Sequence, residues 1–260
     1  QFRDPPPPLD FAPDFPRPRL QDFAGAGLRR SLPADLAAGL RSLAQAEGAT
    51  LFMLCLAAYF ALLQRHTGQE DLVIGSPTAG RSHADLQETV GMFVNMLALR
   101  GRPRPGMSFR ELLGQVRETA LGAFQHQDYQ FVDLVRGLNL PRDPGRNPLF
   151  DAVFELINIS LNQIELPGAT VSNHQFDTGV TPFELLLVLT EDGDQLDLEL
   201  RYATSLYRPE TAQSLAEDYL ALLAQVVARP DTPLSALRLA SGAALRRGAA
   251  GDWDRSAFEF

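Results

Sequence analysis

The stretch VIGSPTAGRSHADLQETVGMFVNMLALR, residues 73–100, decides the fold of this chain. Its beginning continues an apolar run, Asp71–Ser76, that indicates a short buried strand. Its end, Met92–Arg100, forms a second run with strand character. Between the two runs, Pro77 and Gly80 introduce a loop, because both residue types interrupt regular structure. The stretch therefore predicts two strands joined by a long loop.

Helical patterns flank this stretch on both sides. Upstream, the leucines of residues 36–43 repeat at helical spacing, and Thr50 is suited to cap a second helix that Gly68 ends. Downstream, a capping-box pattern at Ser108 opens a helix that runs to about Gln125. Two further helices are predicted at residues 131–138 and 209–228.

Apolar and alternating runs predict four more strands, at residues 23–32, 150–159, 183–190 and 196–203. The last two are joined by the sequence EDGDQ, an acidic, glycine-containing turn of the kind found in β-hairpins. Together with the helices, these strands predict an α+β fold in which a mixed β-sheet is packed by helices.

Both ends of the chain have the composition of linkers. Residues 1–22 are Pro-rich and aperiodic, which favours an extended linker. Residues 240–260 are rich in Ala, Gly and Arg and also lack periodicity. Position 1 is Gln rather than Met. We therefore expect one folded unit, residues 23–239, inside a longer polypeptide.

Composition and charge exclude several classes of protein. The 23 basic residues, all arginine, against 32 acidic ones give a formal net charge of −9, whereas a nucleic-acid footprint is usually basic. Without lysine, Schiff-base chemistry is excluded. The single cysteine, Cys55, excludes an internal disulfide and a multi-cysteine zinc site. The longest uncharged apolar stretch, residues 49–63, is too short to span a bilayer, and no signal peptide opens the chain. We expect a cytoplasmic protein with no nucleic-acid or membrane partner.

No catalytic constellation is visible in the residue spacing. None of the four histidines pairs with a second ligand at metal spacing, so each is expected to be structural or exposed. Ser76, His83 and Asp85 lie close in sequence, but a hydrolase triad needs a geometry that this spacing does not indicate. Spacing alone therefore predicts no catalytic residue and no metal site.

Three segments together resemble a known family. Residues 73–100 resemble the motif IGxPxAGR…GxFVNxLxLR of the condensation domains of non-ribosomal peptide synthetases. Residues 126–138, HQDYQFVDLVRGL, resemble the next motif, HQDxPFExLVxxL. Residues 142–154, RDPGRNPLFDAVF, resemble the one after it, RDxSRxPLFxxxF. The three segments occur in the order and at the spacing of that family.

The resemblance implies a fold of two lobes, each like chloramphenicol acetyltransferase, that meet along a cleft. The active-site motif HHxxxDG belongs to the N-terminal lobe and is absent from this sequence, so the chain resembles the C-terminal lobe alone. Residues 1–22 are then expected to be an inter-lobe linker, and residues 240–260 to lead towards an adenylation-type domain. The implied reaction joins a donor aminoacyl or peptidyl thioester on one carrier protein to the acceptor amine on the next. This lobe alone is expected to be inactive, because it supplies one wall of the substrate tunnel and lacks the candidate base.

The implied partners are the N-terminal condensation lobe, the donor and acceptor carrier proteins and a neighbouring adenylation domain. No cofactor is expected to bind directly, since the phosphopantetheine arm belongs to the carrier proteins. Carrier proteins are usually acidic around that arm, so the basic run Arg100, Arg102 and Arg104, in a predicted loop, is a candidate docking surface. A solvated loop is the alternative. A crossover to the other lobe is expected within residues 172–181.

Four residues are candidates for lining or ordering the tunnel. Ser76 and Thr78 carry hydroxyls that either face the tunnel or satisfy the backbone of a turn. Arg81 is expected to anchor the loop through hydrogen bonds to the backbone or to a carboxylate, the alternative being a surface ion pair of under about 1 kcal/mol. Asn95 lies in an apolar strand, where a buried amide needs partners, so it either orders the site or contacts substrate.

Two expectations concern the loops that follow. Asp128 is suited to cap the helix that begins at Phe131. Arg142 and Arg146 either lie in a solvated loop or form ion pairs that fix the loop against the next strand.

Two other functions stay open: a non-catalytic recruitment domain of the same family, and a stand-alone acyltransferase of the same superfamily. An intact or degraded HHxxxDG motif upstream would separate condensation from recruitment. A linker into adenylation and carrier domains would argue against the acyltransferase.

Overall fold

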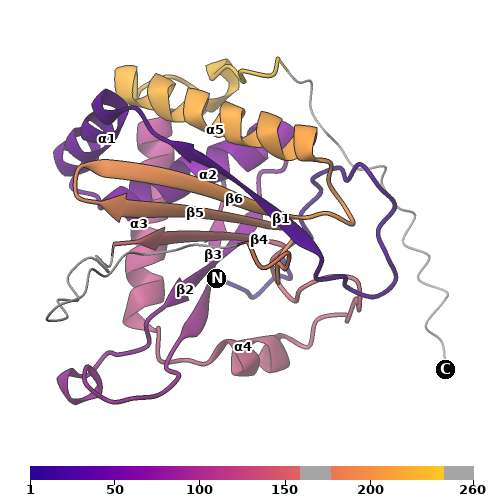
Figure 1. Cartoon of the computed structure of the whole chain (residues 1–260). Helices are drawn as coiled ribbons and strands as arrows, with labels where there is room; N and C mark the ends of the chain where they lie inside the picture. Colours follow the sequence, from indigo (N-terminus) through magenta and orange to yellow (C-terminus); the bar gives the residue numbers. More distant parts are fainter. Residues whose placement is uncertain (159–176, 243–260) are drawn as a thin grey trace, which may run out of the picture.

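The computed structural model describes residues 1–158 and 177–242, which are built around one mixed β-sheet (Figure 1). Its strands are β1 (Gly25–Ser31), β2 (Leu72–Thr78), β3 (Asn95–Gly101), β4 (Ala152–Ile157), β5 (Leu185–Asp192) and β6 (Gln195–Ala203). They lie in the order β1-β6-β5-β4-β2-β3. The pairs β2–β4 and β4–β5 are parallel, and the other neighbours are antiparallel. The predicted α+β class with a mixed sheet is confirmed.

In the described residues, four helices cover one face of the sheet and a fifth lies on the other (Figure 1). The four are α1 (Ala34–Ala46), α2 (Leu51–Thr67), α3 (Phe109–Gln125) and α5 (Pro209–Ala228). Successive side chains of a strand point to opposite faces, so Ile74 packs into the main core with these helices. Val73 faces the other way and joins a smaller cluster with Phe131 of α4 (Phe131–Leu138). The described chain therefore has one deep core and one thinly covered sheet face.

Helix α2 forms the centre of the main core. Every residue from Met53 to Leu63 is buried, so the helix is apolar all round, as expected of a helix enclosed by other elements. Its ends are those that the sequence predicted. The Oγ1 atom of Thr50 accepts a hydrogen bond from the amide of Met53 at 3.2 Å, and Gly68 takes a left-handed φ of 73° at the C-cap.

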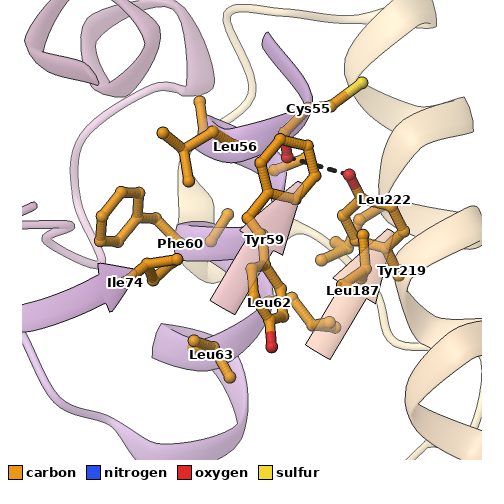
Figure 2. Packing of buried hydrophobic residues seen from close by; sticks show 14 of the residues in the cluster. Cys55, Leu56, Tyr59, Phe60, Leu62, Leu63, Ile74, Leu187, Tyr219 and Leu222 are labelled. Atoms are coloured by element: carbon orange, nitrogen blue, oxygen red, sulfur yellow. Dashed lines mark hydrogen bonds between the residues drawn. The ribbon is translucent and has the colours of Figure 1, made fainter. Parts of the chain in front are cut away.

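Two buried tyrosines meet in this core (Figure 2). The hydroxyl of Tyr219 donates a hydrogen bond to the carbonyl of Cys55 at 2.9 Å. The hydroxyl of Tyr59 is buried without a hydrogen-bond partner. Of these two neighbouring phenols, one is thus hydrogen-bonded and the other is not.

Local sequence signals define several other boundaries. The predicted capping box is present at the start of α3, where Ser108 and Glu111 each bond the other's backbone amide, at 3.2 and 2.7 Å. The predicted β5–β6 hairpin turns at Gly193, which has a φ of 59°. Helices α4 and α5 cover the residues that the apolar spacing indicated.

The third strand begins at Asn95 rather than at Met92, where the sequence predicted it. The preceding residues belong to the loop between β2 and β3, which also contains a short 3-10 helix, η1 (Ala84–Leu86), that was not predicted. The backbone there is fixed by a close approach. Gly80 has a φ of 63°, and a Cβ atom at this position would lie 1.8 Å from the carbonyl oxygen of Phe93. Only a residue without a Cβ atom fits this close approach.

Residues 1–22, called the leader below, lie against the folded unit. Leu9 and Phe11 are buried in the main core. The amides of Asp14 and Phe15 donate to the carbonyl of Leu206 at 2.8 and 3.2 Å. The leader's proline content did not indicate this packing, because its two core side chains stand alone between prolines. Its role as an inter-lobe linker stays a prediction.

A second short 3-10 helix, η3 (Leu234–Ala236), follows α5. The expected crossover within residues 172–181 falls mostly outside the described residues, as does most of the predicted second linker. In the part of the chain that is described, no helix by itself has the length and apolar character to span a membrane; α1 and α2 meet those criteria only as a pair, bent by 104°.

Candidate functional site

Arg81 holds the loop of residues 79–94 between β2 and β3, called the β2–β3 loop below. Its guanidinium donates to the carbonyl of Leu86, and to that of Gly91 at 3.5 Å. The same guanidinium lies over the ring of Phe93, 4.5 Å from its centroid. In return, Gln87 donates to the carbonyl of Arg81 at 3.1 Å. These are backbone hydrogen bonds of the kind expected of Arg81, and they fold the loop onto itself.

The β2–β3 loop presents apolar side chains to solvent. Val90 is 101% exposed, Met92 is 88% exposed and Val94 is 53% exposed. Two apolar residues at the nearby start of α4, Tyr129 and Val132, are also exposed. Large apolar side chains exposed in neighbouring segments are a feature of interaction sites.

Asn95 joins the β2–β3 loop to α4. Its side-chain amide donates to the carbonyls of Gln127 and Tyr129, at 2.8 and 2.9 Å. Its side-chain oxygen accepts from the amides of Met96 and Phe131, at 2.9 and 3.1 Å. All four hydrogen-bonding positions of the amide are therefore used by the protein, and Asn95 is buried. This geometry favours an ordering role over direct contact with a substrate.

The start of α4 corrects one prediction. Asp128 was expected to cap this helix, but the N-cap residue is Gln130, without a side-chain cap, and the oxygen of Asn95 accepts from the first helical amide. A cap supplied from another strand cannot be seen in local sequence. Asp128 is exposed in the connection between α3 and α4.

The two candidate hydroxyls differ in their surroundings. Thr78, at the end of β2, donates from its Oγ1 to the side-chain oxygen of Gln127 at 2.7 Å. This bond fastens the β2 end of the loop to the α3–α4 connection that Asn95 also holds. Ser76 is buried in β2, and by strand alternation its side chain points to the same side as Ile74, towards the helices. Their roles in a substrate tunnel stay predictions.

The basic run at residues 100–104 is not a single exposed loop. Arg100 lies in β3, is buried, and makes a bidentate ion pair with Asp71 at 2.6 and 2.7 Å. It also donates to the carbonyls of Gln1 and Asp4, both at 2.8 Å. Hydrogen bonding to Arg100 lowers the pKa of Asp71. Arg100 is thus removed from the candidate docking surface, while Arg102 and Arg104 remain exposed.

A buried ionic cluster lies at the N-terminal ends of β4 and β5. Arg17 of the leader pairs with Glu184, and Arg146 pairs with Asp151. The hydroxyl of Tyr207 donates to Glu184 at 3.2 Å. Burial, followed by the proximity of Glu184, raises the pKa of Asp151. Of the two interpretations of Arg146, the ion pair is therefore confirmed, whereas Arg142 is exposed.

The histidines form no metal site in residues 1–158 and 177–242, which contain no group of three or more potential ligands. His66 is buried, with its Nε2 atom 3.0 Å from the carboxylate of Asp218. His83 is exposed beside Asp85, at 3.4 Å.

Comparison with known proteins identifies the family. The profile of the condensation domain matches residues 1–246. The chain belongs to the condensation domain family. Among curated proteins it is similar to tyrocidine synthase 3 of Brevibacillus parabrevis, with 40% identity over 241 residues that make up 93% of this chain and 4% of that protein. It is also similar to gramicidin S synthase 2 of Brevibacillus brevis, with 39% identity over 242 residues, 92% of this chain and 5% of that protein. The chain thus spans a small part of the length of these relatives.

Solved structures show the same fold. Holo-AB3403, a four-domain nonribosomal peptide synthetase bound to AMP and glycine, matches 90% of this chain and 19% of its own, with a TM-score of 0.84 and 25% identity. The first condensation domain of the CDA synthetase matches 92% of this chain and 51% of its own, with a TM-score of 0.76 and 25% identity. The X-domain of teicoplanin biosynthesis, solved in complex with OxyB, matches 89% of this chain and 52% of its own, with a TM-score of 0.81 and 26% identity.

Proposed function

We propose that this chain is the C-terminal half of a condensation domain of a non-ribosomal peptide synthetase and forms one wall of its substrate tunnel. In that tunnel, the amine of the acceptor attacks the carbonyl carbon of the donor thioester. The new C–N bond forms, the C–S bond breaks, and the amine loses a proton to a base. The chain's length supports the proposal, because it matches 51% of a solved condensation domain. We expect this condensation reaction to take place in the cytoplasm.

The observation that carries the proposal is the ordered β2–β3 loop. Arg81 fixes its shape from within, and Asn95 and Thr78 fasten its base to the region of α4. A loop that is held this firmly while it exposes Val90 and Met92 is suited to meet a second protein surface. We assign that surface to the N-terminal lobe, which brings the HHxxxDG motif.

The residues of this half act by positioning. Asn95 has no free hydrogen-bonding position for a substrate, and Arg81 is committed to the loop backbone and to Phe93. We assign the base that takes the proton of the amine to the N-terminal lobe, and holding the two carrier-borne substrates in line is the contribution of the tunnel wall. The carrier proteins supply the phosphopantetheine arms, and an adenylation domain supplies the activated amino acid. Arg102 and Arg104 are the candidate contacts for an acidic carrier protein.

The first test is the coding sequence for roughly 200 residues upstream of Gln1, a length set by one domain-sized lobe. An intact HHxxxDG motif there, followed by amide formation when the longer chain receives loaded donor and acceptor carrier proteins, is the expected result. A start codon directly before Gln1, or amide formation by this chain alone, would overturn the proposal.

A recruitment domain is the second candidate function. The X-domain, whose structure is similar to this chain, was solved in complex with another protein, OxyB. The exposed apolar residues of the β2–β3 loop and α4 are compatible with such a role as well. A degraded HHxxxDG motif upstream, together with binding of a partner enzyme, would favour recruitment over condensation.

A further inference from the structure

The segment that leaves the folded unit is held as firmly as the leader that enters it. Residues 229–242, called the exit segment below, follow α5 and bury Leu234 and Leu237. Gln225 of α5 bonds both backbone groups of Arg238, at 2.7 and 2.8 Å. The amide and the hydroxyl of Ser241 each donate to the carboxylate of Asp218 at 2.8 Å. The last described residues are thus fastened to α5.

The C-terminal end of α2 holds the leader. Gln69, just beyond the helix, donates to the carbonyl of Pro8 at 2.9 Å and accepts from the amide of Asp10 at 2.8 Å. The ring of Phe11 packs edge-on against the ring of His66, with centroids 5.5 Å apart at 68°. Phe11 is also 5.5 Å from the ring of Tyr207, so it is enclosed on two sides.

His66 lies between the leader and the exit segment. One part of its ring contacts Phe11 of the leader, and its Nε2 atom lies 3.0 Å from Asp218, the carboxylate that holds Ser241 of the exit segment. His66 and Asp218 are almost completely buried, at 2% and 0% exposure. A displaced ring would therefore disturb its neighbours on both sides, because close-packed interiors transmit small shifts.

We propose that His66 mechanically couples the leader to the exit segment, so that loosening either segment at its contact with His66 or Asp218 loosens the other. Within the proposed function, on which its biological meaning rests, the leader continues to the N-terminal lobe and the exit segment continues to the next domain. Through His66, a change in the position of one neighbouring domain then changes how firmly the C-terminal lobe holds the segment that leads to the other. The coupling itself is a property of this chain and needs no partner protein.

Two backbone amides report on the leader and on the exit segment. The amide of Asp10, bonded to Gln69, reports on the leader, and the amide of Ser241, bonded to Asp218, reports on the exit segment. Hydrogen exchange of these amides is measured on the full chain under native conditions. Phe11→Leu, which removes the ring contact with His66 but keeps an apolar side chain, is expected to speed exchange at Ser241. Ser241→Ala, which removes one bond to Asp218, is expected to speed exchange at Asp10. Each rise should be about twofold or more, the fold-change that corresponds to the lower end of the coupling energies of residues in one contact network.

Matched controls loosen each segment away from His66. Asp14→Asn weakens the leader where the Asp14 carboxylate accepts from the amide of Arg208, at 2.8 Å. Gln225→Ala loosens the exit segment at Arg238. Asp14→Asn should leave exchange at Ser241 unchanged, and Gln225→Ala should leave exchange at Asp10 unchanged.

A third variant, His66→Gln, keeps a polar side chain beside Asp218 but lacks the ring that meets Phe11. In that background, Phe11→Leu should no longer change exchange at Ser241. Unchanged exchange at Ser241 in Phe11→Leu and at Asp10 in Ser241→Ala would overturn the proposal, whichever way the condensation assay turns out. Equal effects in the control variants would also overturn it, because they would indicate general loosening instead of coupling through His66.

Discussion

Replacing Asn95 with alanine is expected to detach α4 and the base of the β2–β3 loop from each other. The substitution removes four hydrogen bonds, to the backbone of Gln127, Tyr129, Met96 and Phe131. A hydrogen bond of this kind contributes about 1 kcal/mol net, and loss of a helix cap alone costs about 1 kcal/mol. The freed groups near α4 regain some water, so we expect Asn95→Ala to lower the free energy of unfolding by about 2–4 kcal/mol.

Urea unfolding of the whole chain measures this loss as a lower midpoint with an unchanged slope. Asp128→Ala is the matched control, because Asp128 is exposed and does not cap α4 through its side chain. It should change stability by no more than about 0.5 kcal/mol. A loss of under about 1 kcal/mol in Asn95→Ala, or an equal loss in the control, would refute the claim that Asn95 joins the two elements.

Three further predictions concern single side chains elsewhere in the fold. Tyr219→Phe should lower the free energy of unfolding by about 1 kcal/mol, because it removes the hydrogen bond to Cys55, whereas Tyr59→Phe should leave stability equal or higher, because it deletes a buried hydroxyl without a partner in the described residues. Denaturant unfolding compares the two variants, and a larger loss in Tyr59→Phe would contradict this prediction. Folding raises the pKa of Asp151 to about 7, so the unfolded chain loses the Asp151 proton at a lower pH than the folded chain, and stability should fall as pH rises from about 4 to about 7. Asp151→Asn should flatten that decline in thermal unfolding measured across this pH range, and an unchanged slope would argue against a raised pKa of Asp151. Gly80→Ala, which places a Cβ atom against the carbonyl of Phe93, should reduce amide formation by the complete condensation domain at least about tenfold, whereas Gly106→Ala, at a site with open space around it, should not; equal rates would exclude a role for the loop shape.

Elements whose signals are local were predictable from the sequence. Thr50, Gly68 and the Ser108–Glu111 capping box mark helix ends through contacts with residues within a few positions. The β5–β6 hairpin is equally local, because an acidic turn with Gly193 joins two alternating runs. Strand β3 is the instructive exception. Met92 and Phe93 are as apolar as the strand that follows, but the Arg81 guanidinium lies over the ring of Phe93 and the Gly80 backbone closely approaches the Phe93 carbonyl, and β3 begins only at Asn95.

Long-range polar contacts were not predictable to the same degree. Arg17 and Glu184 pair across most of the chain, and no spacing rule relates them. Asn95 could be recognised as an amide that must find partners, but its role as the cap of α4 required the fold. Arg100 is adjacent to Arg102 and Arg104 in the sequence, but its bonds to Asp71 and to the leader carbonyls of Gln1 and Asp4 bury it. Residue type thus indicated which side chains mattered, and tertiary structure decided what they contact.

The most direct test of the proposed function is a complementation assay with two separate polypeptides, this chain and an N-terminal lobe that carries HHxxxDG. Donor and acceptor carrier proteins, both loaded, are added to each half alone and to the mixture, and the condensed product is measured by mass spectrometry. We predict product in the mixture only, with a rate that rises to saturation as this chain is added. Product from this chain alone, or a rate in the mixture no greater than that of the N-terminal lobe alone, would contradict the assignment of this chain as the second wall of the tunnel.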